Sequence, residues 1–169
     1  MEKSVNQADC GQNNEISMYK DMPENSDFLA YCKNSLHLQE VDTGMYSPLV
    51  LAYIGDAVYE LIIRTKVINH GSMQVGKMHK KSASLVKAET QANLIKILEP
   101  QLTPEEHAVY KRGRNAKSGT MAKHATMVDY RMATGFEALM GYLFLTEQFT
   151  RMVELVSIGL ESIGEFETE

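Results

Sequence analysis

The chain has 169 residues and a formal net charge of -5, and 44% of its residues are hydrophobic. This length suits one compact domain with a tail and leaves no room for separate cofactor and substrate domains. The acidic balance by itself argues against a polyanionic partner. The charges are unevenly distributed, however: residues 62–125 sum to +8, residues 1–46 to -5 and residues 126–169 to -6. Such a basic middle indicates either a localised anion-binding face or a solvated lysine-rich surface.

The cysteines and the hydropathy pattern exclude several classes of protein. Cys10 and Cys32 form no CxxC motif or Cys/His cluster, so we expect no structural zinc site. Two scattered cysteines are typical of a reducing compartment. No uncharged run is long enough to span a bilayer, and the N-terminus lacks the apolar run of a signal peptide. We therefore expect a cytoplasmic protein without membrane contact.

The pattern along the chain predicts an all-α fold, a helical bundle, because strand signals are nearly absent. Residues 1–36 are polar and are expected to be a poorly ordered extension, in which residues 26–32 could form one or two helical turns. The globular domain is predicted over residues 37–165. Its five predicted helices cover residues 48–68, 79–98, 103–113, 129–145 and 148–162.

Capping residues mark the ends of these helices. Ser47 precedes Pro48 at the first predicted start, and Gly71 ends that helix. Thr103 begins a sequence with the spacing of a capping box, and Gly113 is expected to close the helix that follows. Asp129 is the predicted cap of the next helix.

Two of the predicted helices are apolar almost all round and should be buried. Residues 48–63 carry only Asp56 and Glu60, and residues 132–146 carry only Glu137. A buried carboxylate is costly unless it is paired or binds a metal, so Asp56 and Glu137 could share a divalent cation. A buried ion pair, or a rim position facing water, is the alternative, and the spacing alone slightly favours it. Glu60 stands four residues before Arg64, which predicts a surface ion pair.

The basic residues gather at the start of the second predicted helix and around a glycine-rich loop. These side chains, with backbone amides, can bind phosphate groups, and the lack of interleaved aromatic residues favours a duplex over a single strand. A solvated positive loop is the alternative. The candidate RNA-binding residues are Lys80, Lys81, Arg112, Arg114, Asn115, Lys117 and Lys123.

Two motifs resemble the ribonuclease III family. Residues 51–61 (LAYIGDAVYEL) resemble its signature helix, and residues 135–144 (GFEALMGYLF) resemble its second acidic helix. Residues 79–82 and 111–120 (KRGRNAKSGT) resemble its mini-ribonuclease III branch, which lacks a double-stranded-RNA-binding domain. The resemblance runs over about residues 40–160.

This resemblance implies a homodimeric endoribonuclease that hydrolyses double-stranded RNA with Mg²⁺. Asp56 and Glu137 match the family's essential acids and would be its catalytic and metal-binding residues. The implied substrate is the 23S ribosomal RNA precursor, whose 5′ and 3′ ends the branch matures, with a ribosomal protein as an optional further partner. An apolar stretch near residues 49–53 would form the dimer interface.

The chain also departs from the larger enzymes of the family. Leu49, Ala52 and Thr134 stand where those enzymes carry further acids. We therefore expect one Mg²⁺ ion held by Glu137, with Asp56 orienting its waters. The alternative function is a catalytically inactive RNA-binding dimer of the same fold.

Overall fold

The computed structural model describes residues 28–69, 71, 73–117 and 126–166. The chain divides into two compact units, residues 1–40 and 41–169. The described part of the first unit contains one helix, α1 (Phe28–Ser35), where the sequence predicts one or two helical turns. Residues 1–27 of the predicted extension lie outside the described residues.

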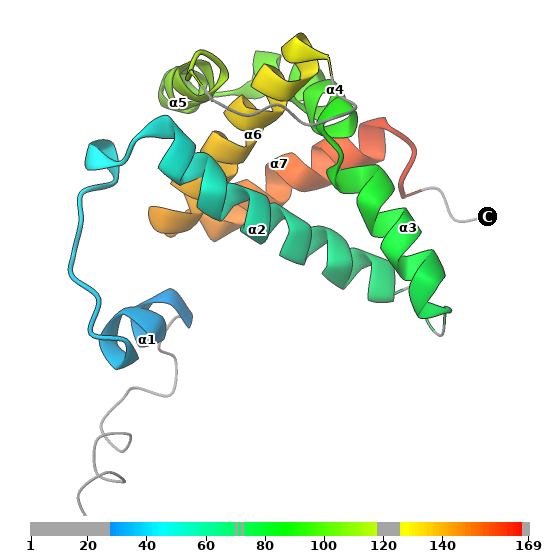
Figure 1. Cartoon of the computed structure of the whole chain (residues 1–169), viewed down its shortest axis with the longest axis horizontal. Coiled ribbons are helices and arrows are strands. Elements are labelled where there is room, and N and C mark those ends of the chain that lie inside the picture. The colour runs from blue at the N-terminus through cyan, green and yellow to red at the C-terminus, as the bar shows by residue number, and fades with distance from the viewer. Residues whose placement is uncertain (1–27, 70, 72, 118–125, 167–169) are drawn as a thin grey trace, which may run out of the picture. The chain divides into compact units, whose positions relative to one another are not determined.

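The second unit is a bundle of α-helices, and no strand occurs among the described residues, so the all-α prediction is confirmed (Figure 1). Short 3₁₀ turns at Thr43–Met45 and Glu99–Gln101 precede the helix that begins at Pro48 and follow the helix that ends at Leu98. None of the described helices is long and apolar enough to cross a membrane. The helices are α2 (Pro48–Ile68), α3 (Val75–Val86), α4 (Ala88–Leu98), α5 (Pro104–Arg114), α6 (Met127–Leu145) and α7 (Phe149–Ser162).

Two predicted helix starts are confirmed and a third is wrong by three residues. The Ser47 side chain accepts a hydrogen bond from Val50 N, and Thr103 forms the predicted capping box with Glu106. The cap of α6 is Thr126 rather than Asp129. Asp129 is the residue that this cap binds. The backbone N of Asp129 donates to Thr126 Oγ1 over 3.1 Å, and the Thr126 hydroxyl donates to the Asp129 carboxylate.

The helix predicted over residues 79–98 is instead two helices. Lys87 separates α3 from α4 and has extended backbone angles, with ψ at 149°. The break is stabilised by side chains that donate hydrogen bonds to backbone carbonyls. In a continuous helix these carbonyls would accept from backbone N–H groups of the next turn. Thr90 Oγ1 donates to Ser84 O over 2.7 Å, and the Tyr59 hydroxyl donates to Leu85 O over 3.1 Å. These tertiary donors favour the break despite good local helix propensity.

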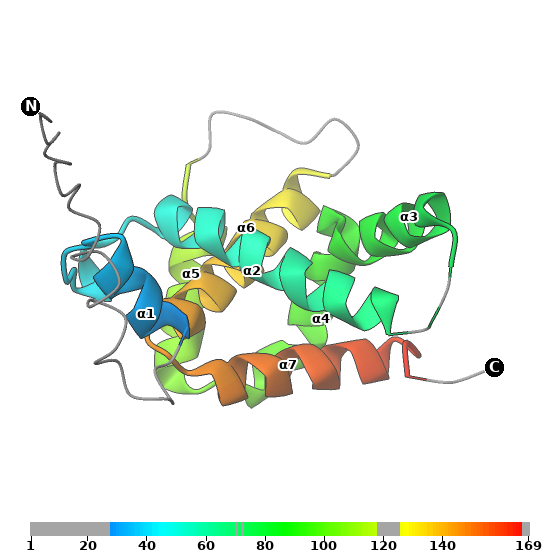
Figure 2. The same cartoon turned by 90° about the horizontal axis from the view of Figure 1, so that it is seen from below.

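Helix α6 lies at the centre of the bundle, in contact with α2, α4, α5 and α7 (Figures 1 and 2). Its side chains Phe136, Leu139, Met140 and Leu143 are fully buried, as the sequence predicts for this helix. The prediction that α2 is buried in the bundle holds for one side of this helix only. Tyr53 is 83% exposed, because α6 covers only one side of α2 in the single chain.

Gly113 has a different role from the predicted one. Helix α5 continues past it to Arg114 and is capped by Asn115. A Cβ on Gly113 would lie 2.7 Å from Ala138 Cβ and 2.9 Å from Gly135 Cα. Gly113 therefore allows α5 and α6 to pack closely and does not terminate a helix.

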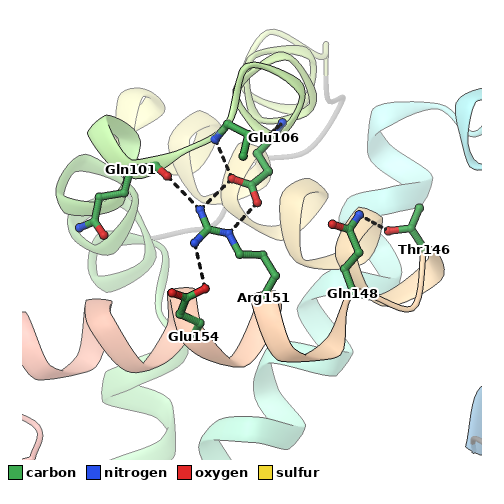
Figure 3. A network of polar contacts seen from close by, with 7 residues as sticks. Gln101, Glu106, Thr146, Gln148, Arg151 and Glu154 are labelled. Atoms are coloured by element: carbon green, nitrogen blue, oxygen red, sulfur yellow. Dashed lines mark hydrogen bonds and ion pairs between the residues drawn. The ribbon is translucent and has the colours of Figure 1, made fainter.

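An ion-pair network joins α7 to the start of α5 (Figure 3). Arg151 Nε donates to Glu106 Oε1 over 2.8 Å, and its Nη2 atom donates to Gln101 O over 2.9 Å. A further bond of 3.0 Å runs from Arg151 Nη1 to Glu154. The same Glu106 side chain completes the capping box of α5, so one guanidinium fixes the position of this helix end.

Candidate active site

The candidate site is at the crossing of α2 and α6, where the two backbones nearly touch. A Cβ on Gly55 would lie 1.8 Å from Glu137 O, and one on Gly141 would lie 2.0 Å from Leu51 O. Only glycine fits at either position. Since Asp56 follows Gly55 and Glu137 supplies the opposing carbonyl, this contact sets the spacing between the two acidic residues.

The two carboxylates differ in their exposure but influence each other. Asp56 is exposed to solvent, whereas Glu137 is partly buried. Burial raises the pKa of Glu137 to about 8, and the negative charge of Asp56 raises it as well. Although the Asp56 residue is exposed, partial desolvation of its carboxylate raises its pKa, and the charge of Glu60 raises it further. The structure therefore brings together the two acids that the sequence selects.

Neither acid has the basic partner that an ion pair would require. Among the described residues, no Lys or Arg forms a hydrogen bond or ion pair with Asp56 or Glu137. The closest arginine along the helix, Arg64, is bound to Glu60, with 2.6 Å between Nη2 and Oε1. This surface pair is the one that the sequence predicts. The ion-pair alternative for the two acids is therefore not observed, while the rim alternative describes the exposed Asp56.

A third polar side chain, Gln91 on α4, lies beside Glu137. It is fully buried, and its amide is close enough to the Glu137 carboxylate to lower the pKa of that group. Neither Nε2 nor Oε1 has a partner at hydrogen-bond distance and angle within the described residues. The sequence analysis missed Gln91. Its only signal is a polar residue in the apolar face of residues 88–98.

The donor set suits a hard cation. No group of three or more His, Cys, Asp or Glu residues with metal-binding geometry occurs in the described part of the chain. Mg²⁺ is commonly bound by only one or two carboxylates, with waters and substrate phosphates completing its shell. Two carboxylates without a basic partner and a buried unpaired amide fit such an ion.

The positions of the missing family acids are visible in the structure. Ala52 and Thr134 are buried, and the Thr134 hydroxyl donates to Tyr130 O over 3.0 Å. Leu49 is 38% exposed. None of the three offers an ionised ligand to a cation.

The predicted RNA-binding residues fall into two groups. Lys80 and Lys81 are on α3, which packs on the C-terminal half of α2, whereas α5 packs near the N-terminal half. In both views α3 and α5 are far apart (Figures 1 and 2). A helix the length of α2 spans roughly 30 Å, so the two groups do not form one patch. The second group comprises Arg112, Arg114, Asn115 and Lys117.

These basic side chains have different surroundings. Lys81 forms an ion pair of 2.7 Å with Glu165, and the Arg114 guanidinium lies 5.5 Å from the centroid of the Tyr110 ring. Lys80 and Arg112 are exposed. Asn115 caps α5 and is exposed, as is Lys117, whereas Lys123 lies outside the described residues.

Comparison with known proteins agrees with this geometry. The model of the Ribonuclease III domain matches residues 49–148. The chain is 49% identical to Mini-ribonuclease 3 of Clostridium tetani over 118 residues, which cover 69% of this chain and 78% of that protein. It is 41% identical to Mini-ribonuclease 3 of a Thermoanaerobacter species over 137 residues, which cover 81% of this chain and 96% of that protein.

A solved structure extends the comparison to the fold. The crystal structure of a protein from Fusobacterium nucleatum matches with a TM-score of 0.67 and 29% sequence identity, covering 75% of this chain and 100% of that chain. The fold, the acidic pair and the matched domain together define an all-α endoribonuclease. The chain belongs to the ribonuclease III family, in the branch of its Mini-ribonuclease 3 relatives.

Proposed function

We propose that the chain is a Mg²⁺-dependent endoribonuclease that cleaves double-stranded RNA. The observation that carries the proposal is the pairing of Asp56 with Glu137 across the glycine contact of α2 and α6, without a basic partner among the described residues. Two neighbouring carboxylates repel each other and so destabilise the fold, unless a bound cation offsets their repulsion.

The two acids have separate tasks in this proposal. Glu137, the more buried, holds the cation, and Asp56, exposed at the rim, orients the waters bound to it. The bound Mg²⁺ supplies an activated water and stabilises negative charge on the phosphate. Leu49, Ala52 and Thr134 add no ionised ligand, so we propose a single ion.

A duplex is the substrate that fits the distribution of positive charge. The exposed groups on α3 and α5 lie too far apart for one small ligand, whereas a duplex presents phosphates along its whole length. Arg112→Ala and Lys80→Ala should each lower the slope of log K against log salt by roughly 0.7–0.9 per lost phosphate contact. An unchanged slope in both variants would place the RNA elsewhere.

We further propose a homodimer that uses the exposed apolar face of α2. Val50 is 45% exposed and Tyr53 is 83% exposed, close to the start of that helix. Tyr53→Glu should shift the protein towards monomer in sedimentation velocity, since a charge on this face must be desolvated in the dimer. A dimer of unchanged affinity would exclude this face as the interface.

The 23S ribosomal RNA precursor is the proposed substrate, cut at its 5′ and 3′ ends in the cytoplasm, with or without a ribosomal protein bound. This part of the proposal rests on the mini-ribonuclease III resemblance of the motifs, and the names of the relatives support only the branch. Cleavage of a duplex that pairs the two precursor ends, compared with an unrelated duplex of equal length, tests it. Equal cleavage rates on both duplexes would contradict the ribosomal substrate but not the endoribonuclease activity.

One assay separates the nuclease from the inactive RNA-binding dimer. Purified protein is incubated with duplex RNA in Mg²⁺ and then in EDTA, and both cleavage and binding are followed. The nuclease cuts only with the cation, and Asp56→Asn abolishes cutting while the protein stays folded. Glu60→Gln is the matched control, one turn further along α2, and should cut at close to the wild-type rate. Binding without cutting by the wild type would select the inactive dimer.

A further inference from the structure

Gln91 is a polar residue in a position that packing alone would give to an apolar one. It belongs to the buried face of α4 with Ala92, Leu94, Ile95 and Leu98, and it is 0% exposed. Both its amide nitrogen and its amide oxygen lack hydrogen-bond partners among the described residues. A buried amide without partners is unfavourable, and leucine would fill a similar volume without that cost.

The neighbour of this amide is the site carboxylate of Glu137. Helix α4 packs directly on α6, which carries Glu137. The amide lies close enough to that carboxylate to oppose the upward effects of burial and of Asp56 on the pKa of Glu137, although it makes no hydrogen bond of ordinary geometry within the described residues. Glu137 on α6 thus has a carboxylate of α2 and an amide of α4 as its polar neighbours.

We propose that Gln91 is a positioning residue of the metal site, an inference that rests on the proposed function. With a cation bound, its Nε2–H would donate to the Glu137 carboxylate and hold that side chain in the orientation that binds the ion. Its Oε1 would accept a hydrogen bond from a water on the ion. Both amide atoms that are unpaired within the chain then have partners.

The chemistry of the amide explains why no ionisable residue would serve here. A lysine would neutralise Glu137 and compete with the cation for it, and a further carboxylate would add repulsion to a pair that already repels. A glutamine both donates and accepts without changing the charge of the site. Groups that hydrogen-bond to the ligands of a metal orient those ligands in many proteins.

Gln91→Leu tests the proposal by separating stability from cation binding. We expect the variant to be at least as stable as the wild type in EDTA, because two unpaired buried polar atoms are removed. The rise of Tm with added Mg²⁺ should then require roughly 10-fold to 100-fold more Mg²⁺ than in the wild type. RNA cleavage should fall in kcat at low Mg²⁺ and recover in part at high Mg²⁺, with little change in KM for RNA.

Ser82→Ala is the matched control, because it removes a buried polar group from α3 outside the acidic pair. Its Mg²⁺ response should equal that of the wild type. Gln91→Met, which keeps the length of the side chain, gives the same comparison if the leucine variant misfolds. A Gln91 variant that loses stability in EDTA but keeps the wild-type Mg²⁺ response would show that the residue is only structural and overturn the inference.

The same measurements separate this inference from the proposed function. If the wild type responds to Mg²⁺ and cuts RNA while the Gln91 variants respond equally, only the role of Gln91 is overturned. If the wild type neither responds to Mg²⁺ nor cuts RNA, the proposed function fails and the role of Gln91 fails with it.

Discussion

Replacing Gly55 with alanine tests whether the contact between α2 and α6 holds the site together. A Cβ at residue 55 would lie 1.8 Å from Glu137 O and 2.6 Å from Gly141 N. Non-bonded heavy atoms pack best at about 3.5 Å, so the two helices must separate by roughly 1.5 Å. The obstacle is backbone on both sides, which cannot rotate away as a flexible side chain could.

The size of the effect follows from two opposing terms. Alanine is the better helix former by about 1 kcal/mol, which by itself would stabilise the variant. Overpacking of a core costs about 1–3 kcal/mol and sometimes more. Because backbone atoms block the new methyl group, we expect the upper part of that range and a net loss of about 2 kcal/mol. Cleavage should fall about 100-fold even in the folded fraction, because a displacement of about 1 Å is enough for such a loss.

Urea unfolding followed by circular dichroism measures the first quantity, and single-turnover cleavage of duplex RNA measures the second. Gly76→Ala is the control, because its Cβ would meet nothing within 4 Å. It should leave activity unchanged and raise the free energy of unfolding by at most about 1 kcal/mol. A Gly55→Ala protein with the stability and the activity of the wild type would refute the reasoning.

Three further predictions concern pH and single hydrogen bonds. Without a divalent cation, the free energy of unfolding should fall by a few kcal/mol as pH rises through the pKa of Glu137, which is raised to about 8, and Glu137→Gln should flatten this fall in urea titrations. Arg151→Met should cost about 3 kcal/mol by the same method, because Glu106 stays buried without its partner. The guanidinium holds the pKa of Glu106 below its ordinary value, so this contribution should be present above the ordinary carboxyl pKa and disappear as the pH falls; a pH-independent difference would contradict it. Tyr59→Phe should cost about 1–2 kcal/mol in thermal unfolding, because Leu85 O loses a buried hydrogen bond.

The sequence predicts those parts of the fold that depend on nearby residues. The caps at Ser47 and Thr103 need only the first turn that follows them, and the structure confirms both. The rarity of charge in two apolar helices selects Asp56 and Glu137 without any knowledge of the fold. Their proximity depends on how α2 crosses α6. The sequence suggests this crossing only through Gly55, and the close contact at Gly55 and Gly141 in the structure establishes it.

The features that sequence reasoning missed all depend on distant partners. The break at Lys87 lies in a segment with good helix propensity, and it forms because the Tyr59 hydroxyl reaches Leu85 O from another helix. Glycine is common where a helix ends, but at Gly113 the missing side chain allows α6 to pack closely. Gln91 is one polar residue in an apolar face, and its importance is evident only once Glu137 lies beside it. In each case a tertiary contact overrides the local preference.

The candidate site combines a close contact between two helix backbones with unfavourable electrostatics. The glycine contact prevents α6 from moving towards α2, and moving the two helices apart would open the core around Phe136 and Leu139. Packing energy therefore holds in place two acids that repel each other and an amide that lacks partners. In the proposed function, a cation bound here would offset both unfavourable terms without any movement of the helices. We therefore expect a looser crossing to lose affinity for the cation before it loses the fold.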